Sequence, residues 1–136
     1  MIHVLLVALV TLAGCVSYEY GNADITNKSV TDQVQIGKST KDDIRKLLGT
    51  PSSTSRGKLP EARPGDASYD LVMDEWWVYF HGDIKHDPRM FIPYAGLLFS
   101  NTDHDADHYV IGFDAKGVTQ HVSFGKQKAK TRGVIQ

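Results

Sequence analysis

The apolar and polar positions divide the chain into one strongly apolar run near its start and several shorter periodic segments after it. Residues 4–13 contain one polar side chain, Thr11. This run has about half of the roughly 20 residues that a helix needs to cross a bilayer. It matches the apolar core of a secretory signal peptide. We therefore predict a signal peptide over residues 1–14.

The best-defined helix is predicted just before Gly49. Its apolar positions follow the i, i+3, i+4 spacing of one helix face and are Ile44, Leu47 and Leu48. Thr40 and Asp43 have the spacing of a capping box, with aspartate in place of the usual glutamate. Gly49 suits the left-handed residue that ends a helix. A helix of about nine residues is unstable alone, so it must pack onto another element.

A weaker helix is predicted for residues 29–36. Ser29 is its predicted cap, Val30 and Val34 share one face, and Gly37 ends the segment. The two short helices, joined by a short turn, would form a helical hairpin.

Alternation with a period of two predicts strands in the second half of the chain. Residues 75–82 are rich in aromatic and branched side chains, and Trp77 and Tyr79 share one of their two faces. Residues 108–124 have the pattern of a hairpin with its turn at 114–117. These segments predict a small antiparallel sheet of about three strands.

Four less regular segments flank these elements. They are a tether with the cysteine (15–28), a long exposed loop (52–70), an insertion (82–107) and a basic frayed tail (126–136). The predicted domain spans residues 29–125, and the insertion carries an uncharged apolar stretch at 90–99. Two helices that cover one face of the sheet give an α+β fold of two layers.

Composition adds one informative feature, the cysteine. With 41% hydrophobic residues and a formal net charge of −1, the chain is an ordinary domain with no strong attraction to nucleic acid. The one cysteine, Cys15, follows directly on the apolar run. A core cysteine could lie anywhere in the sequence, and a disulfide needs two. The position of Cys15 therefore indicates a processing and attachment site.

Leu12-Ala13-Gly14-Cys15 resembles the lipobox of bacterial lipoproteins. The resemblance implies cleavage before Cys15, a diacylglycerol thioether on its sulfur and acylation of the new amino group. Val16 is not aspartate, which by resemblance to sorted lipoproteins implies the periplasmic face of the outer membrane of a Gram-negative bacterium. The alternative is a buried N-terminal strand or helix with a core cysteine, and the segment before the run lacks the usual Lys or Arg.

The order of the elements resembles that of the SmpA/OmlA family of BamE-like outer-membrane lipoproteins. The resemblance covers about residues 29–124 and rests on four features. They are Ile36-Gly37, the capped helix ending in Leu48-Gly49-Thr50-Pro51, the Trp-rich strand, and the turn with Phe113, Asp114, Gly117 and Val118. It implies two helices followed by three antiparallel strands, and action by protein binding, with the β-barrel assembly machine as a candidate partner.

Apolar and aromatic side chains are the candidate partner contacts, because aromatic residues dominate interface energetics. They are Trp77, Tyr79, Phe91, Tyr94, Leu97 and Phe99. The alternative for the strand is a core position, and the alternative for residues 90–99 is that they fold back over the sheet.

Metal and catalytic chemistry have less support in the sequence. His104, Asp107 and His108 are weak candidate metal ligands, and a second group lies between His81 and Asp87. The alternative is a solvated polar loop. There is no Gly-x-Ser-x-Gly elbow, no Gly-rich phosphate loop and no thiol once Cys15 is acylated. We therefore expect that the protein is not an enzyme and that it binds no cofactor and no metal ion.

The expected function is that of a lipoprotein held in the bilayer by acylated Cys15. It would bind an envelope protein, as an accessory or scaffold in outer-membrane protein assembly or maintenance. The alternative is an inhibitor- or immunity-type module that blocks an envelope enzyme, with Arg56 and Arg63 on its contact loop. A third hypothesis is a metal-binding lipoprotein.

Overall fold

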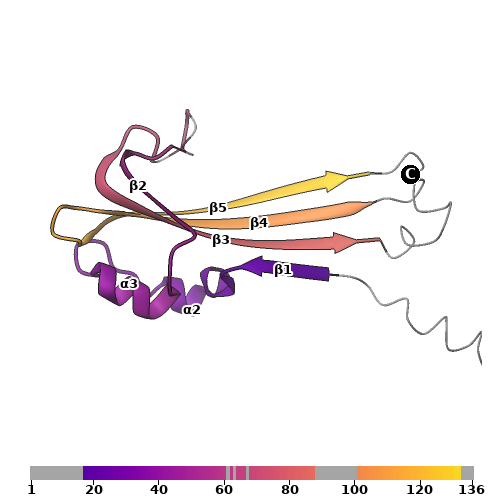
Figure 1. The fold of residues 1–136 in the computed structure, drawn as a ribbon, viewed down its shortest axis with the longest axis horizontal. Coiled ribbons are helices and arrows are strands. Elements are labelled where there is room, and N and C mark those ends of the chain that lie inside the picture. Colours follow the sequence, from indigo (N-terminus) through magenta and orange to yellow (C-terminus); the bar gives the residue numbers. More distant parts are fainter. Residues whose placement is uncertain (1–16, 61, 63, 67, 88–100, 133–136) are drawn as a thin grey trace, which may run out of the picture. The chain divides into compact units, whose positions relative to one another are not determined.

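The protein has an α+β fold, in which two short helices accompany a five-stranded antiparallel open sheet (Figure 1). The computed structural model describes residues 17–60, 62, 64–66, 68–87 and 101–132. The predicted signal peptide, Cys15 and the apolar stretch at 90–99 lie outside the described residues. The elements are β1 (Ser17–Gly21), η1 (Ala23–Thr26), α2 (Lys28–Thr31), α3 (Lys41–Leu48), β2 (Ser53–Lys58), β3 (Val72–His86), β4 (Thr102–Phe113) and β5 (Thr119–Thr131).

The sheet has the strand order β1-β3-β4-β5, and β2 also pairs with β3. The β2–β3 pairing is antiparallel, from Ser53 opposite Val78 to Lys58 opposite Val72, with an irregularity between Ser55 and Gly57. The chain forms two compact units, and the larger one contains Tyr20–Gly82 and Ala106–Gln127. The smaller unit takes the remaining described residues, including Asp83–Asp87 and Lys128–Arg132.

Helix α3 forms as its sequence predicts. Thr40 and Asp43 make the capping box in both directions, and Gly49 follows with a positive φ of 69°. Its two buried side chains, Ile44 and Leu48, pack in the core of the larger unit. The other members of this core cluster are Ile25, Trp77, Tyr79, Tyr109, Ile111 and Phe113.

The other face of the larger unit's strands carries a second apolar cluster. Its buried members are Leu59, Trp76 and Val110, and Leu71 and Met73 pack against them. Trp76 donates a hydrogen bond from Nε1 to the carbonyl of Gly57, at 2.8 Å. The two tryptophans therefore point to opposite faces, and the segment after β2 covers the second face.

Several sequence predictions were wrong because hydrogen bonding to β3 and β4 outweighs polar composition. The exposed loop at 52–70 contains strand β2, and the tether at 15–28 contains β1 and η1. The insertion at 82–107 contributes its ends to β3 and β4, and the tail at 126–136 is strand β5 as far as Thr131.

The weaker helix was also mispredicted in its bounds. It is α2, a single turn that begins one residue earlier than predicted, and the side chain of Asn27, not that of Ser29, caps it. No helix among the described residues has the length and apolarity needed to span a membrane.

Ion pairs link the strands in the described part of the smaller unit. Lys128 lies 3.8 Å from Asp105 and Lys130 lies 3.8 Å from Asp103, across the pair of strands β4 and β5. On β3, Lys85 lies 2.9 Å from Asp83. The hydrogen bond to Asp83 and its negative charge raise the pKa of Lys85. The alternating Asp and Lys residues therefore stabilise the strand pair through cross-strand pairing.

Candidate functional site

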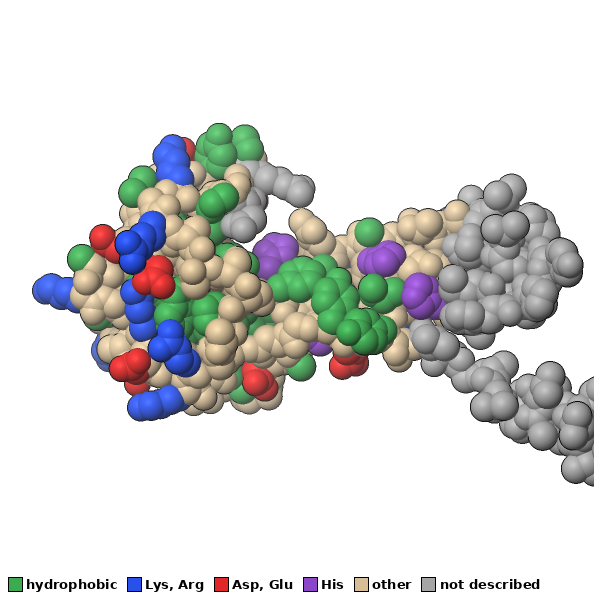
Figure 2. Space-filling model, viewed as in Figure 1, with side chains coloured by type: hydrophobic (Ala, Val, Ile, Leu, Met, Phe, Trp, Pro, Cys, Tyr) green, Lys and Arg blue, Asp and Glu red, His purple; other side chains and the backbone are tan. Residues whose placement is uncertain are grey.

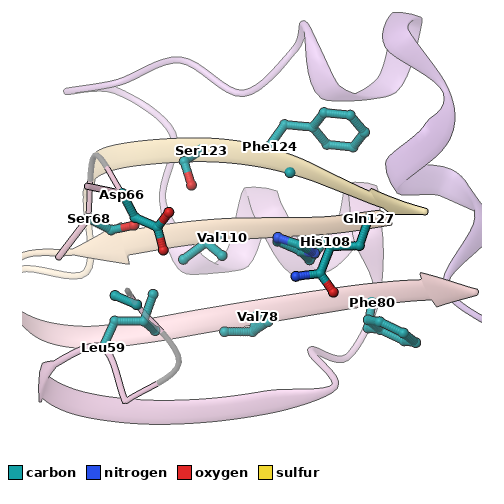
Figure 3. A pocket seen from close by; sticks show the side chains of 12 residues that line it. Leu59, Asp66, Ser68, Val78, Phe80, His108, Val110, Ser123, Phe124 and Gln127 are labelled. Atoms are coloured by element: carbon teal, nitrogen blue, oxygen red, sulfur yellow. The ribbon is translucent and has the colours of Figure 1, made fainter. Parts of the chain in front are cut away.

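Two hollows in the larger unit are the candidate binding sites. The first, the His108 groove, has a volume of about 450 Å³ and lies on the face that carries Trp76. Its apolar lining comes from Leu59, Ala62, Val78, Phe80, Val110 and Phe124, and its polar side chains are Asp66, Ser68, His108, Ser123 and Gln127, with Gly125 completing the lining (Figure 3). Its size falls within the range of small-ligand sites.

His108 lies directly over Gly125 of the neighbouring strand. A Cβ atom at position 125 would lie 2.2 Å from Nε2 of His108, closer than real contacts allow. Glycine at this position therefore makes room for the imidazole. The groove contains Ser, His and Asp side chains, but within the described residues His108 makes no hydrogen bond to Ser123 or Ser68. His108 and these two serines are thus not joined as a base and a nucleophile in the described residues.

His121 lies on the same face, beside Trp76. The two rings meet edge to face with centroids 5.8 Å apart, and burial lowers the pKa of His121. Its Nε2 atom is buried without a hydrogen-bond partner in the described part of the chain. His121 is therefore better explained as a neutral packing residue than as a site residue.

The second hollow, the Phe124 groove, has a volume of about 710 Å³. Its apolar lining is Ile25, Val34, Ile36, Tyr109, Val122 and Phe124, and its polar lining is Thr26, Lys28, Thr31, Asp32 and Lys126. Ile36 is 60% exposed and Phe124 is 45% exposed, so two large apolar side chains of one groove face solvent.

Tyr109 is, with Ile25, one of the two buried side chains that line this groove. Its hydroxyl donates a long hydrogen bond of 3.5 Å to the carbonyl of Thr31, and burial raises its pKa to about 12. Beside it, Lys126 lies 5.3 Å from the centroid of the Phe124 ring and 3.5 Å from Asp107. The groove thus combines apolar side chains with charged ones, which are Lys126 and the ion pair of Lys28 with Asp32.

The Phe124 groove includes part of an outer strand of the sheet. Strand β5 is last in the strand order, and the segment before α3 pairs with Val118 and with Thr119, the first residue of β5. Gly37 N donates to Thr119 O at 2.7 Å, and Thr119 N donates to Ser39 O at 2.9 Å. Beyond this pairing, no strand among the described residues pairs with the outer side of β5.

The structure changes the set of candidate contacts. Trp77 and Tyr79, predicted as partner contacts, are 1% and 0% exposed in the core beneath α3. That prediction was wrong for them, because the helix layer covers their face of β3. The other predicted contacts lie outside the described residues: Phe91, Tyr94, Leu97, Phe99 and the lipidation site Cys15.

The weak metal candidates belong to strand β4, not to a loop. Asp107 pairs with Lys126, and His108 lies over Gly125. His104 belongs to the smaller unit. No group of three or more His, Cys, Asp or Glu side chains in the described ranges is placed to hold a metal ion. Arg56 of the predicted inhibitor loop is exposed on β2, and Arg63 lies outside the described residues.

Sequence reasoning missed Ile36 and Phe124 as site residues. Phe124 was assigned only to the predicted hairpin at 108–124, and Ile36 only to the weak helix and to the Ile36-Gly37 feature of the family resemblance. A signal was present in the sequence of β5 itself, because Val122, Phe124 and Lys126 are spaced two residues apart and therefore share one face of the strand. The charged side chains on the face shown in Figure 2 are of both signs and interspersed, which agrees with the small net charge.

Comparisons of the chain with protein-family models, with curated proteins and with solved structures found no match. The site is therefore interpreted from its own residues.

Proposed function

We propose that this protein is a bacterial lipoprotein, anchored in the outer membrane through acylated Cys15, and that it acts by binding an envelope protein. The observation that carries the proposal is the sequence Leu12-Ala13-Gly14-Cys15 at the end of an apolar run of signal-peptide length. Two or three acyl chains give stable anchoring where one is marginal. The SmpA/OmlA-like order of elements supports a role in outer-membrane protein assembly or maintenance.

The described site favours binding over catalysis. The Phe124 groove exposes Ile36 and Phe124 to solvent, as interaction sites do. The His108 groove has no hydrogen bond between His108 and either serine that lines it. A protein held at the membrane meets its partner at a high effective concentration, so a modest surface is sufficient.

The anchor is tested by labelling cells with an alkyne analogue of palmitate and fractionating their membranes. The full chain should take up the label and sediment with the outer membrane, and Cys15→Ala should lose both properties. The matched control is Val16→Asp, which should keep the label and move to the inner membrane. Unlabelled wild-type protein, or Cys15→Ala that still fractionates with membranes, would exclude the anchor.

Partner binding is tested by in-cell photo-crosslinking from position 36, with position 72 as the exposed control. A β-barrel assembly subunit among the products would support the proposed role. A soluble hydrolase would support the alternative of an inhibitor- or immunity-type module. If position 36 captures no envelope protein, or if position 72 captures the same protein equally well, the proposal of binding through the Phe124 groove fails.

A further inference from the structure

We propose that the outer side of β5 between Val122 and Gln127, with the Phe124 groove beside it, accepts a strand of a partner protein. The accepted segment is extended, and its side chains that face the groove are two apolar residues and one acidic residue. The inference deepens the proposed function by naming the kind of partner, and it rests on that function only in taking binding as the mode of action.

The backbone of β5 determines the type of occupant. Every residue from Val122 to Gln127 carries one N–H and one C=O, and an edge strand leaves half of these without strand partners. In the described residues only the segment at 37–41 pairs onto this side, and it stops at Thr119. An added strand would satisfy these groups by extending the sheet.

The side chains on the groove face determine what that strand presents. Val122 and Phe124 are apolar, and Lys126 follows two residues later on the same face. In an added strand, the residues beside Val122 and Phe124 would bury apolar surface, and the residue beside Lys126 would face a cation. Ile36, which is 60% exposed, supplies further apolar surface in the same groove.

The charge of Lys126 favours an acidic residue at the third groove-facing position of the added strand, which lies beside Lys126. The partner of Lys126 on the inner side is Asp107, at 3.5 Å, and the side chain of Lys126 is still 60% exposed. A carboxylate from the open side would place Lys126 between two acidic residues of adjacent strands, which is the favourable cross-strand arrangement.

The same argument disfavours a second copy of the chain. Strand β5 carries Lys126, Lys128 and Lys130 and no acidic residue. Pairing β5 with another β5 would bring two basic strands together without a carboxylate on either. Self-association through this edge is therefore an outcome of the test that would contradict the proposal.

The test uses the full-length chain purified in detergent, a preparation that does not depend on acylation of Cys15, and defined peptides as probes. The acidic probes are Thr-Val-Thr-Phe-Thr-Glu-Thr and its reversed sequence, because the direction of pairing is not fixed. A basic probe replaces Glu by Lys, and a broken probe replaces the two central threonines by proline, which removes backbone donors. Binding is measured by fluorescence anisotropy and by the hydrogen exchange of β5 amides.

The acidic probe should bind best and should slow exchange at residues 122–127 by at least about threefold. Phe124→Glu should weaken it by about tenfold or more, and Phe124→Leu should retain most of the affinity. The matched control is Val72→Glu, because Val72 is 67% exposed and lines neither groove. If Phe124→Glu fails to fold, Lys126→Glu carries the test, and it should reverse the preference in favour of the basic probe.

Equal binding of the acidic and broken probes would overturn strand addition. Equal weakening by Val72→Glu and Phe124→Glu would overturn the location, and an unchanged preference in Lys126→Glu would overturn the charge assignment. Sedimentation that shows a dimer lost in Phe124→Glu would assign the edge to self-association instead. Failure of the lipid anchor would leave peptide binding unchanged, so the two proposals fail separately.

Discussion

The indole Nε1 of Trp77 lies 2.6 Å from Oε1 of Glu75, two residues earlier on the same strand. The other carboxylate oxygen of Glu75 accepts a hydrogen bond from Nζ of Lys41, in the first turn of α3. Lys41 and then Trp77 hold the pKa of the Glu75 carboxyl below its usual range. This carboxylate therefore connects the buried core of β3 to the start of the helix that covers it.

Glu75→Gln should lower the free energy of unfolding by about 1–2 kcal/mol near neutral pH, because the bond to Lys41 loses its charge. The lowered pKa means that the folded state binds fewer protons than the unfolded state as the pH falls. The stabilisation is therefore present above the ordinary glutamate pKa and lost as the pH falls through the lowered value. Urea unfolding of both proteins at neutral and strongly acidic pH should show a difference that disappears in acid.

Thr40→Ala should destabilise the protein by about 1 kcal/mol, because it removes the acceptor that caps the N–H of Asp43. Thr40→Ser keeps the hydroxyl and should stay close to the wild type. Thermal unfolding followed by far-UV circular dichroism measures both. Equal stability of the alanine and serine variants would show that the hydroxyl of Thr40 contributes nothing to α3.

Gly125→Ala should cost about 1–3 kcal/mol, because the new methyl group would meet the imidazole of His108. His108→Ala should relieve this cost, so the double variant should be more stable than the sum of the single effects predicts. Ser123→Ala, on the same strand, adds no atom and serves as the control. Urea unfolding of the four variants gives the coupling, and additive effects would contradict the close contact.

The sequence predicted α3 with its caps because each signal for this helix is local. Thr40, Asp43 and Gly49 act on neighbours within one or two turns, so their spacing is enough. The hairpin of β4 and β5 was predicted for the same reason, since its turn places Gly117 at a positive φ of 76°. These elements could be predicted because all of the residues that determine them are close together in the sequence.

Strands β1 and β2 could not be predicted because their partner, β3, lies far away in the chain. Their sequences, SYEYG and STSRGK, are polar and mostly exposed, and pairing with β3 alone makes them strands. The Phe124 groove was missed for a related reason. Ile36 and Phe124 are far apart in sequence, and only the fold brings them to one groove. The burial of Trp77 likewise could not be predicted, because it depends on packing against α3. The aromatic residues of this strand suited a core and an interface equally well.

The lysines of β5 give the last prediction, which concerns solubility. Replacing Lys126, Lys128 and Lys130 by threonine removes three ion pairs, in which the lysines are exposed, with Asp107, Asp105 and Asp103. Such pairs contribute about 0–1 kcal/mol each, so the variant should remain folded. Its outer strand would then lack the charges that oppose edge-to-edge pairing, and the purified protein should form larger assemblies in light scattering.

The control for this prediction replaces Lys38, Lys46 and Lys116 by threonine, because all three are exposed and none belongs to a strand. It changes the net charge by the same amount, so loss of solubility in both variants would indicate net charge rather than the strand edge. Association of the β5 variant alone would show that these lysines protect the edge. Because Lys126 also lines the Phe124 groove, the residue that opposes unspecific pairing would be the same one that selects an acidic strand.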